Sequence, residues 1–123
     1  MSDDLTTLAD LKSRVSAFNR DRDWGRYHSP RNLAMALSVE AAELLELYLW
    51  CEDDGPQPAV ESRGPKVADE MADVLICLLS LADRTGVDLA DAMTSKLARN
   101  AVKYPVEKVS GRMEKYDEYG SDE

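Results

Sequence analysis

Glu40 and Glu43 form an acidic pair three residues apart, and Glu70 and Asp73 repeat this spacing later in the chain. Residues three apart are neighbours on a helix, so each pair presents two carboxylates side by side. Both pairs interrupt strongly apolar segments, where clustered like charges are costly unless a cation binds them. Mg²⁺ and Mn²⁺ prefer such oxygen ligands. The sequence therefore predicts a Mg²⁺ site, with Mn²⁺ as a substitute, built from Glu40, Glu43, Glu70 and Asp73.

Other chemistries fit the residues less well. A single Glu-x-x-Glu pair is common on solvated helices, and only its repetition inside apolar stripes favours a metal site. A di-iron bundle needs two Glu-x-x-His motifs, but the chain has one histidine, His28. No signature supports a Ser or Cys triad around that histidine, and no glycine-rich phosphate loop is present. Metal ions and side chains would have to hold any phosphate.

The spacing of apolar residues predicts an all-α fold, a four-helix bundle without strands. The expected helices cover residues 5–19, 30–50, 66–85 and 89–104. Residues 20–28 and 52–65 are expected to be loops, and the chain beyond residue 105 is expected to fray.

Capping residues give the expected helix ends. Asp3 or Asp4 is the expected cap of the first helix, and Ser29 followed by Pro30 is a strong start signal for the second. Gly86 is expected to end the third helix, and Asp88 to cap the fourth.

The size of the chain suits one domain. With 123 residues, of which 44% are hydrophobic, we expect a domain over residues 1–110 and a charged, disordered tail over residues 111–123. The helix at 66–85 is apolar on nearly all sides, so it needs cover on two faces. A second copy of the chain is the simplest cover, which predicts a homodimer or homotetramer through apolar helix faces.

Charge and cysteine content limit the partners and the compartment. A net charge of −9 argues against binding to a nucleic-acid polymer. The longest apolar run, residues 74–82, is about half of the ~20 residues that a membrane span requires. Two distant cysteines and the lack of a signal-like N-terminus favour the cytoplasm.

Taken together, the motifs resemble those of the all-α nucleoside triphosphate pyrophosphohydrolases, the MazG-like superfamily, and most closely its small dCTP pyrophosphatase branch. The two acidic pairs are accompanied, in family order, by Asp23-Trp24, His28-x-Pro30-Arg31-Asn32, Trp50, Val87-Asp88-Leu89 and Lys96-x-x-x-Asn100-x-x-x-Tyr104-Pro105. The resemblance covers roughly residues 8 to 110.

This resemblance implies Mg²⁺-dependent hydrolysis of a nucleoside triphosphate, dCTP or a modified dCTP, between its α and β phosphates. It also implies assembly into dimers or dimers of dimers. The four acids would be metal ligands and catalytic residues, with Glu43 orienting the attacking water. The implied substrate contacts are Trp24, His28 and Trp50 at the base and sugar, and Lys96, Asn100 and Tyr104 at the phosphates.

One position departs from the family pattern. Cys77 stands where members acting on dCTP are expected to carry an aromatic residue, which leaves the base and sugar preference open. A second interpretation also stays open, in which the chain is a catalytically idle helical module that binds a metal, a nucleotide or a protein without turnover.

Overall fold

The computed structural model describes residues 2–49 and 64–111, and every regular element in these ranges is helical. The prediction of an all-α fold is confirmed. The chain divides into two compact units, residues 1–87 and 88–123, which are described separately below. The expected single domain over residues 1–110 stays a prediction, and nearly all of the expected tail lies outside the described residues.

Helix α1, Leu8–Asp21, begins later than predicted because its cap is Thr7. The Thr7 hydroxyl accepts a hydrogen bond from the Asp10 backbone N–H at 3.1 Å, and the Asp10 carboxylate accepts one from the Thr7 backbone N–H at 3.1 Å. This reciprocal capping box satisfies two backbone donors that the helix leaves free. The prediction of Asp3 or Asp4 as the cap was wrong.

The segment between the first two long helices, predicted as a loop, contains a short helix, η1 (Trp24–Tyr27). Asp23 precedes it with φ +55°, a left-handed conformation that aspartate tolerates and that turns the chain after α1. The Asn32 side-chain amide then donates to the Tyr27 carbonyl at 2.9 Å and ties η1 to the start of α2. Asp23 at its start and the Asn32 hydrogen bond at its end therefore define the path of this segment.

Helix α2, Pro30–Tyr48, starts as predicted: the Ser29 hydroxyl accepts from the Asn32 backbone N–H at 3.1 Å, and Pro30 occupies the first position. Helix α3, Gly64–Thr85, ends at Gly86, whose φ of +72° a β-carbon would disfavour. The Val87 backbone N–H bonds the Ala82 carbonyl at 3.0 Å, which closes the helix end.

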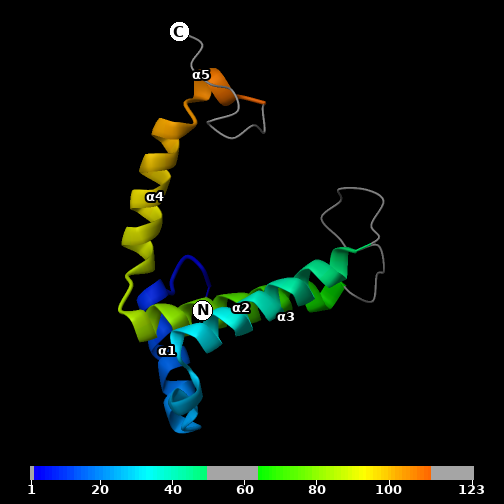
Figure 1. Ribbon diagram of the computed structural model, residues 1–123, viewed down its shortest axis with the longest axis vertical. Coiled ribbons are helices and arrows are strands. Elements are labelled where there is room, and N and C mark those ends of the chain that lie inside the picture. The colour runs from blue at the N-terminus through cyan, green and yellow to red at the C-terminus, as the bar shows by residue number, and fades with distance from the viewer. Residues whose placement is uncertain (1, 50–63, 112–123) are drawn as a thin grey trace. The chain divides into compact units, whose positions relative to one another are not determined.

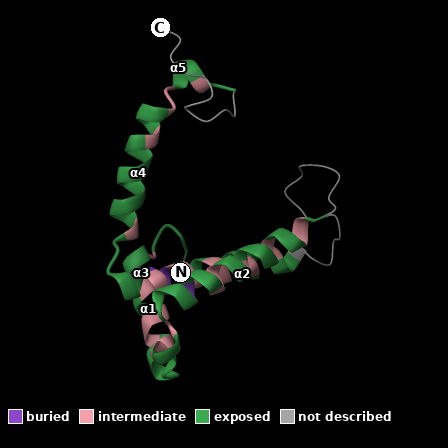
Figure 2. Cartoon of the chain, viewed as in Figure 1, coloured by how far each residue is buried: buried purple, intermediate pink, exposed green. Residues whose placement is uncertain are grey.

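Helices α2 and α3 run side by side, and α1 packs against α3 (Figure 1). Leu33 of α2 and Leu79 and Ala82 of α3 form the buried core, which takes up few of the described residues (Figure 2). Ser80, also buried, accepts a hydrogen bond from the side-chain amide of Asn19 on α1.

Large apolar side chains on α2 and α3 remain exposed in the single chain. On α2 and at its C-cap they are Met35, Val39, Leu45 and Leu49, and on α3 they are Met71, Leu75 and Ile76. The α3 residues lie on the helix that the sequence predicts to need a second cover. Within the described residues, that cover is missing.

The second unit contains helix α4, Leu89–Lys103, and the short helix α5, Val106–Val109. The Asp88 carboxylate accepts from the Asp91 backbone N–H at 2.9 Å, so the predicted cap is confirmed. The expectation that the chain frays from residue 106 was wrong at its beginning. Pro105 ends α4 but also fits the start of a new turn, because its ring fixes φ and it lacks an N–H.

Replacing Thr7 with Ala should lower the free energy of unfolding by about 1 kcal/mol, because the Asp10 backbone N–H loses its partner. Urea unfolding followed by circular dichroism measures the change. Asp3→Ala and Asp4→Ala serve as controls and should leave the midpoint unchanged. A larger loss in either control than in Thr7→Ala would contradict the observed cap.

Candidate metal and nucleotide site

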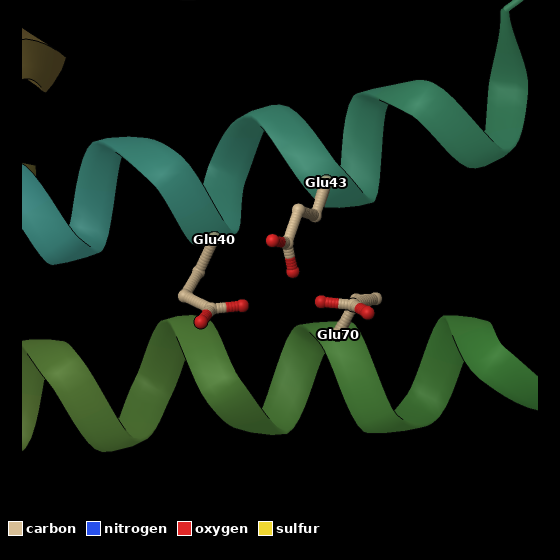
Figure 3. A group of neighbouring side chains, drawn as sticks. All are labelled: Glu40, Glu43 and Glu70. Carbon is tan, nitrogen blue, oxygen red and sulfur yellow. The ribbon is translucent and has the colours of Figure 1, made fainter.

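Three of the four predicted acids meet between α2 and α3. Glu40 and Glu43 project from α2 toward Glu70 on α3, and their carboxylates converge in the space between the two helices (Figure 3). One carboxylate oxygen from each of the three residues lies within 4.8 Å of the others. The spacing of three within α2 places two acids on the side that faces α3.

Two oxygen atoms of this cluster are left without partners in the described part of the chain. Oε2 of Glu40 and Oε2 of Glu70 are each buried and have no hydrogen-bond partner among the described residues. A buried polar atom without a partner is costly, and a carboxylate oxygen more so when other acids surround it. The pair of orphaned oxygens is therefore an observation in favour of a bound cation.

The electrostatic strain also appears in the pKa values. Burial raises the pKa of Glu40 to about 7, and hydrogen bonding to Glu43 and the negative charge of Glu43 add to the rise. The charges of Asp73 and Glu70 act in the same direction. Burial likewise raises the pKa of Glu70, and a hydrogen bond with Glu40 opposes part of that rise.

Asp73, the fourth predicted acid, is half-buried and is not one of the three residues whose oxygens meet. Its charge nevertheless reaches the cluster, since it raises the pKa of both Glu40 and Glu70. Cys77, one helical turn further along α3, lies within the same field: after burial, the charges of Glu40 and Asp73 raise the pKa of its thiol. The thiol therefore stays protonated near neutral pH.

The donor set fits a hard divalent cation. Glu40, Glu43 and Glu70 offer only carboxylate oxygens, which suit Mg²⁺ or Mn²⁺, and Asp73 adds a negative charge that acts on the cluster. Because Mg²⁺ commonly keeps several waters, three or four carboxylates are sufficient. Three of the four acids expected from the sequence thus meet in a group that could hold a metal, and the role of Asp73 as a ligand stays a prediction.

An open cavity of about 320 Å³ adjoins the cluster, lined by Glu43, Glu46, Leu47, Lys66 and Glu70. Lys66 was missed by sequence reasoning, although a signal existed. It precedes Glu70 by one helical turn, and residues four apart share a helix face. Lys66 brings a positive charge to the edge of an otherwise acidic site.

Trp24 and His28, predicted to contact the base, lie together. Trp24 is 43% exposed as a residue, and its ring packs edge-on against Phe18, with ring centroids 5.6 Å apart, and against His28 at 6.3 Å. His28 lines a second cavity, of about 260 Å³, between α1, η1, α2 and α3. Trp50, the third residue of the predicted pocket, lies outside the described residues.

The predicted phosphate contacts belong to the second unit. Lys96 and Asn100 are one turn apart on α4, and Tyr104 follows at its C-cap with its backbone N–H bonded to the Asn100 carbonyl at 2.8 Å. The spacing of four places all three on one helix face, with Lys96 exposed and the other two half-buried. Their part in the site stays a prediction.

None of the helices in the described residues is long and apolar enough to span a membrane.

The helical fold and the doubled acidic motif define the class of protein. Residues 35–119 match the MazG-like family, and the chain belongs to this family. It is 41% identical over 112 residues to dCTP pyrophosphatase 1 of Mus musculus, an alignment that covers 89% of this chain and 66% of the mouse protein. The human protein of the same name is 40% identical over 114 residues, covering 91% of this chain and 67% of the human protein.

The chain thus spans about two thirds of the length of these relatives. Among solved structures, it is similar to a pyrophosphatase from Archaeoglobus fulgidus, with a TM-score of 0.71 and 36% sequence identity. That similarity covers 80% of this chain and 92% of the archaeal chain.

The stability of the metal-free protein should fall as pH rises. The folded pKa of Glu40, about 7, exceeds its ordinary value of 4.5, so the folded state binds a proton more tightly than the unfolded state does. The resulting penalty is absent below the ordinary pKa, grows between the two values and is complete above the folded pKa. Thermal unfolding in a chelator across this range measures it, and the slope should be shallower in Glu40→Gln.

Mg²⁺ should reverse this trend, because it binds ionised carboxylates and stabilises only the folded site. The rise in melting temperature at millimolar Mg²⁺ should be larger near pH ~8 than near pH ~6, since protons compete for the ligands at the lower pH. Asp69→Asn, a neighbour of Glu70 outside the cluster, is the matched control and should respond like the wild type. An equal Mg²⁺ effect at both pH values, or one that survives in Glu40→Gln, would contradict the assigned ligands.

Proposed function

We propose that this chain hydrolyses a deoxynucleoside triphosphate between the α and β phosphates and releases the monophosphate and pyrophosphate. The observation that carries the proposal is the meeting of three carboxylates, two with orphaned oxygens, in a chain of the MazG-like family. Relatives named dCTP pyrophosphatase 1, at 40–41% identity, support dCTP or a modified dCTP as the substrate.

Glu40, Glu43, Glu70 and Asp73 hold the cofactor, Mg²⁺, with Mn²⁺ as a substitute. When bound, it polarises phosphoryl oxygens and neutralises the charge that develops on them. Of the three converging acids, Glu43 is the most exposed and borders the open cavity. It is therefore suited to orient the attacking water and accept its proton.

Lys66 lies beside the carboxylates on the same cavity and can hold phosphate oxygens as a point charge. On α4, Lys96, Asn100 and Tyr104 present a polar helix face with one cation and one amide, which suits the same task. The base and sugar are proposed to meet Trp24, His28 and Trp50. The half-exposed ring of Trp24 supports stacking on a flat base.

The exposed apolar side chains of α3, Met71, Leu75 and Ile76, support assembly into a homodimer or homotetramer. Burial of such side chains is the main favourable term in association, and a contiguous apolar patch marks an interaction surface. A second copy of the same helix offers a matching apolar surface, as a two-fold interface requires.

The cytoplasm is the proposed compartment. The half-buried Cys77 is a free thiol, which suits a reducing environment. The net charge of −9 supports a small metal-bound nucleotide as the partner, in preference to a nucleic-acid polymer.

Incubation with Mg²⁺ and each of the four dNTPs should release pyrophosphate and the monophosphate, and no orthophosphate. Glu43→Gln should lower kcat by about 100-fold or more, because general-base catalysis contributes at least that factor. Product analysis by anion-exchange chromatography measures both. Asp69→Asn is the matched control and should retain activity.

Release of orthophosphate alone would contradict cleavage between the α and β phosphates. Binding of Mg²⁺ and nucleotide without any product would instead identify the chain as an idle binding module. Full activity of Glu43→Gln would overturn the role of that residue.

In solution the protein should have two or four times the mass of one chain by light scattering. Ile76→Asp, which places a charge on the exposed apolar face of α3, should lower that mass, because the charge would have to be desolvated at the interface. Asp69→Asn should leave it unchanged. A wild-type protein with the mass of a single chain would contradict the proposed assembly.

A further inference from the structure

The cavity beside His28 is separate from the acidic cluster and has a different character. Its lining includes two positively and two negatively charged residues, Arg20, Arg84, Asp23 and Asp83. Their formal charges cancel, whereas the cluster of Glu40, Glu43 and Glu70 is purely acidic. A balanced polar cavity suits an uncharged, hydrogen-bonding group better than a triphosphate.

Asn19 and Ser80 connect two walls of this cavity. The Asn19 side-chain amide on α1 donates to the Ser80 hydroxyl on α3 at 3.1 Å. Ser80 is only 7% exposed, and Asn19 is half-buried. The pair is therefore held in place by packing on both helices.

The pair keeps hydrogen-bonding capacity beyond this one bond. The bond uses one amide hydrogen of Asn19, which also carries a second hydrogen and a carbonyl oxygen. The Ser80 hydroxyl accepts in this bond and retains its own hydrogen as a donor. An amide that offers a donor and an acceptor together can read the polar edge of a nucleobase, as asparagine does with adenine in DNA.

The distance between the acidic cluster and the cavity also suits a nucleotide. Ser80 follows Asp73 on α3 by seven residues, which corresponds to about 10 Å along the helix. This is comparable with the reach from the α-phosphate of a nucleotide to the far edge of its base. A substrate with its phosphates at the acids can therefore extend its base toward the cavity, past Cys77.

We propose that Asn19 and Ser80 determine the base preference of the enzyme by hydrogen bonding to the polar edge of the nucleobase in this cavity. The inference rests on the proposed function and adds a specificity-determining pair to it. His28 lines the cavity, and Trp24 packs edge-on against His28. These rings can stack on any base, and Asn19 with Ser80 supplies the discrimination that stacking lacks.

The test compares kcat and KM for the four dNTPs in wild type, Asn19→Ala, Asn19→Asp and Ser80→Ala. The ratio of kcat/KM between the preferred and the other dNTPs should fall by about 10-fold or more, because a base that cannot pair leaves buried polar groups unsatisfied. The loss should appear mainly as a rise in KM for the preferred base. Asn19→Asp preserves the shape but changes the donor pattern, so it should alter which base is preferred.

Thr85→Ala is the matched control, since it removes a hydroxyl that bonds the Leu81 carbonyl on the same helix, outside the cavity lining. It should retain the wild-type base ratios. Folding of each variant is checked by the Mg²⁺-induced rise in melting temperature. Unchanged base ratios in folded Asn19→Asp and Ser80→Ala would overturn the inference.

Binding of non-hydrolysable α,β-methylene dNTP analogues separates this inference from the proposed reaction. If the wild type releases no pyrophosphate but binds the analogues with a base preference that Asn19→Asp alters, the proposed reaction fails and the inference holds. If the wild type hydrolyses dNTPs and the variants bind all analogues as it does, the reaction holds and the inference fails.

Discussion

The central constraint on this structure is the mutual repulsion of carboxylates held between α2 and α3. Glu40, Glu43 and Glu70 bring carboxylate oxygens within 4.8 Å of one another at the seam between α2 and α3. Packing of these helices forces the charges together. Without a bound cation, burial and the neighbouring acids raise the pKa of Glu40. Hydrophobic packing of the two helices therefore sustains an unfavourable charge arrangement that a divalent cation can turn into a stabilising one.

Local signals predicted most of the helices because each signal and the feature it controls are close in sequence. Ser29 with Pro30 and Gly86 gave the start of α2 and the end of α3. The two errors have different causes. Thr7 outcompeted the earlier aspartates as a cap because Asp10 could complete a reciprocal box, and the sequence between α1 and α2 lacks the apolar period that would reveal η1.

The acidic cluster was predictable for a related reason. The helical spacing within each acidic pair already places its two carboxylates on one helix face, and only the packing of α2 against α3 was needed to bring the two faces together. The second cavity was not predictable in this way. Asn19 and Ser80 are 61 residues apart and neither belongs to a motif, so only the packing of α1 on α3 brings them into contact. Lys66 is an intermediate case. Its spacing from Glu70 could be read from the sequence, but the cavity that it lines could not.

The packing of α1, α2 and α3 also separates two requirements that a nucleotide-hydrolysing site must meet. In the proposed function, the acids near the middle of α2 and α3 would handle phosphate chemistry, which is the same for every nucleoside triphosphate. Near the end of α3, where α1 and η1 join it, lies the polar cavity proposed for the base, the part of a nucleotide that varies. Because about 10 Å of helix separates Asp73 from Ser80, the proposal implies that changes in the cavity alter base preference without disturbing the carboxylates. Cys77 lies between the two, within the field of the acids, so a substitution there would act on both.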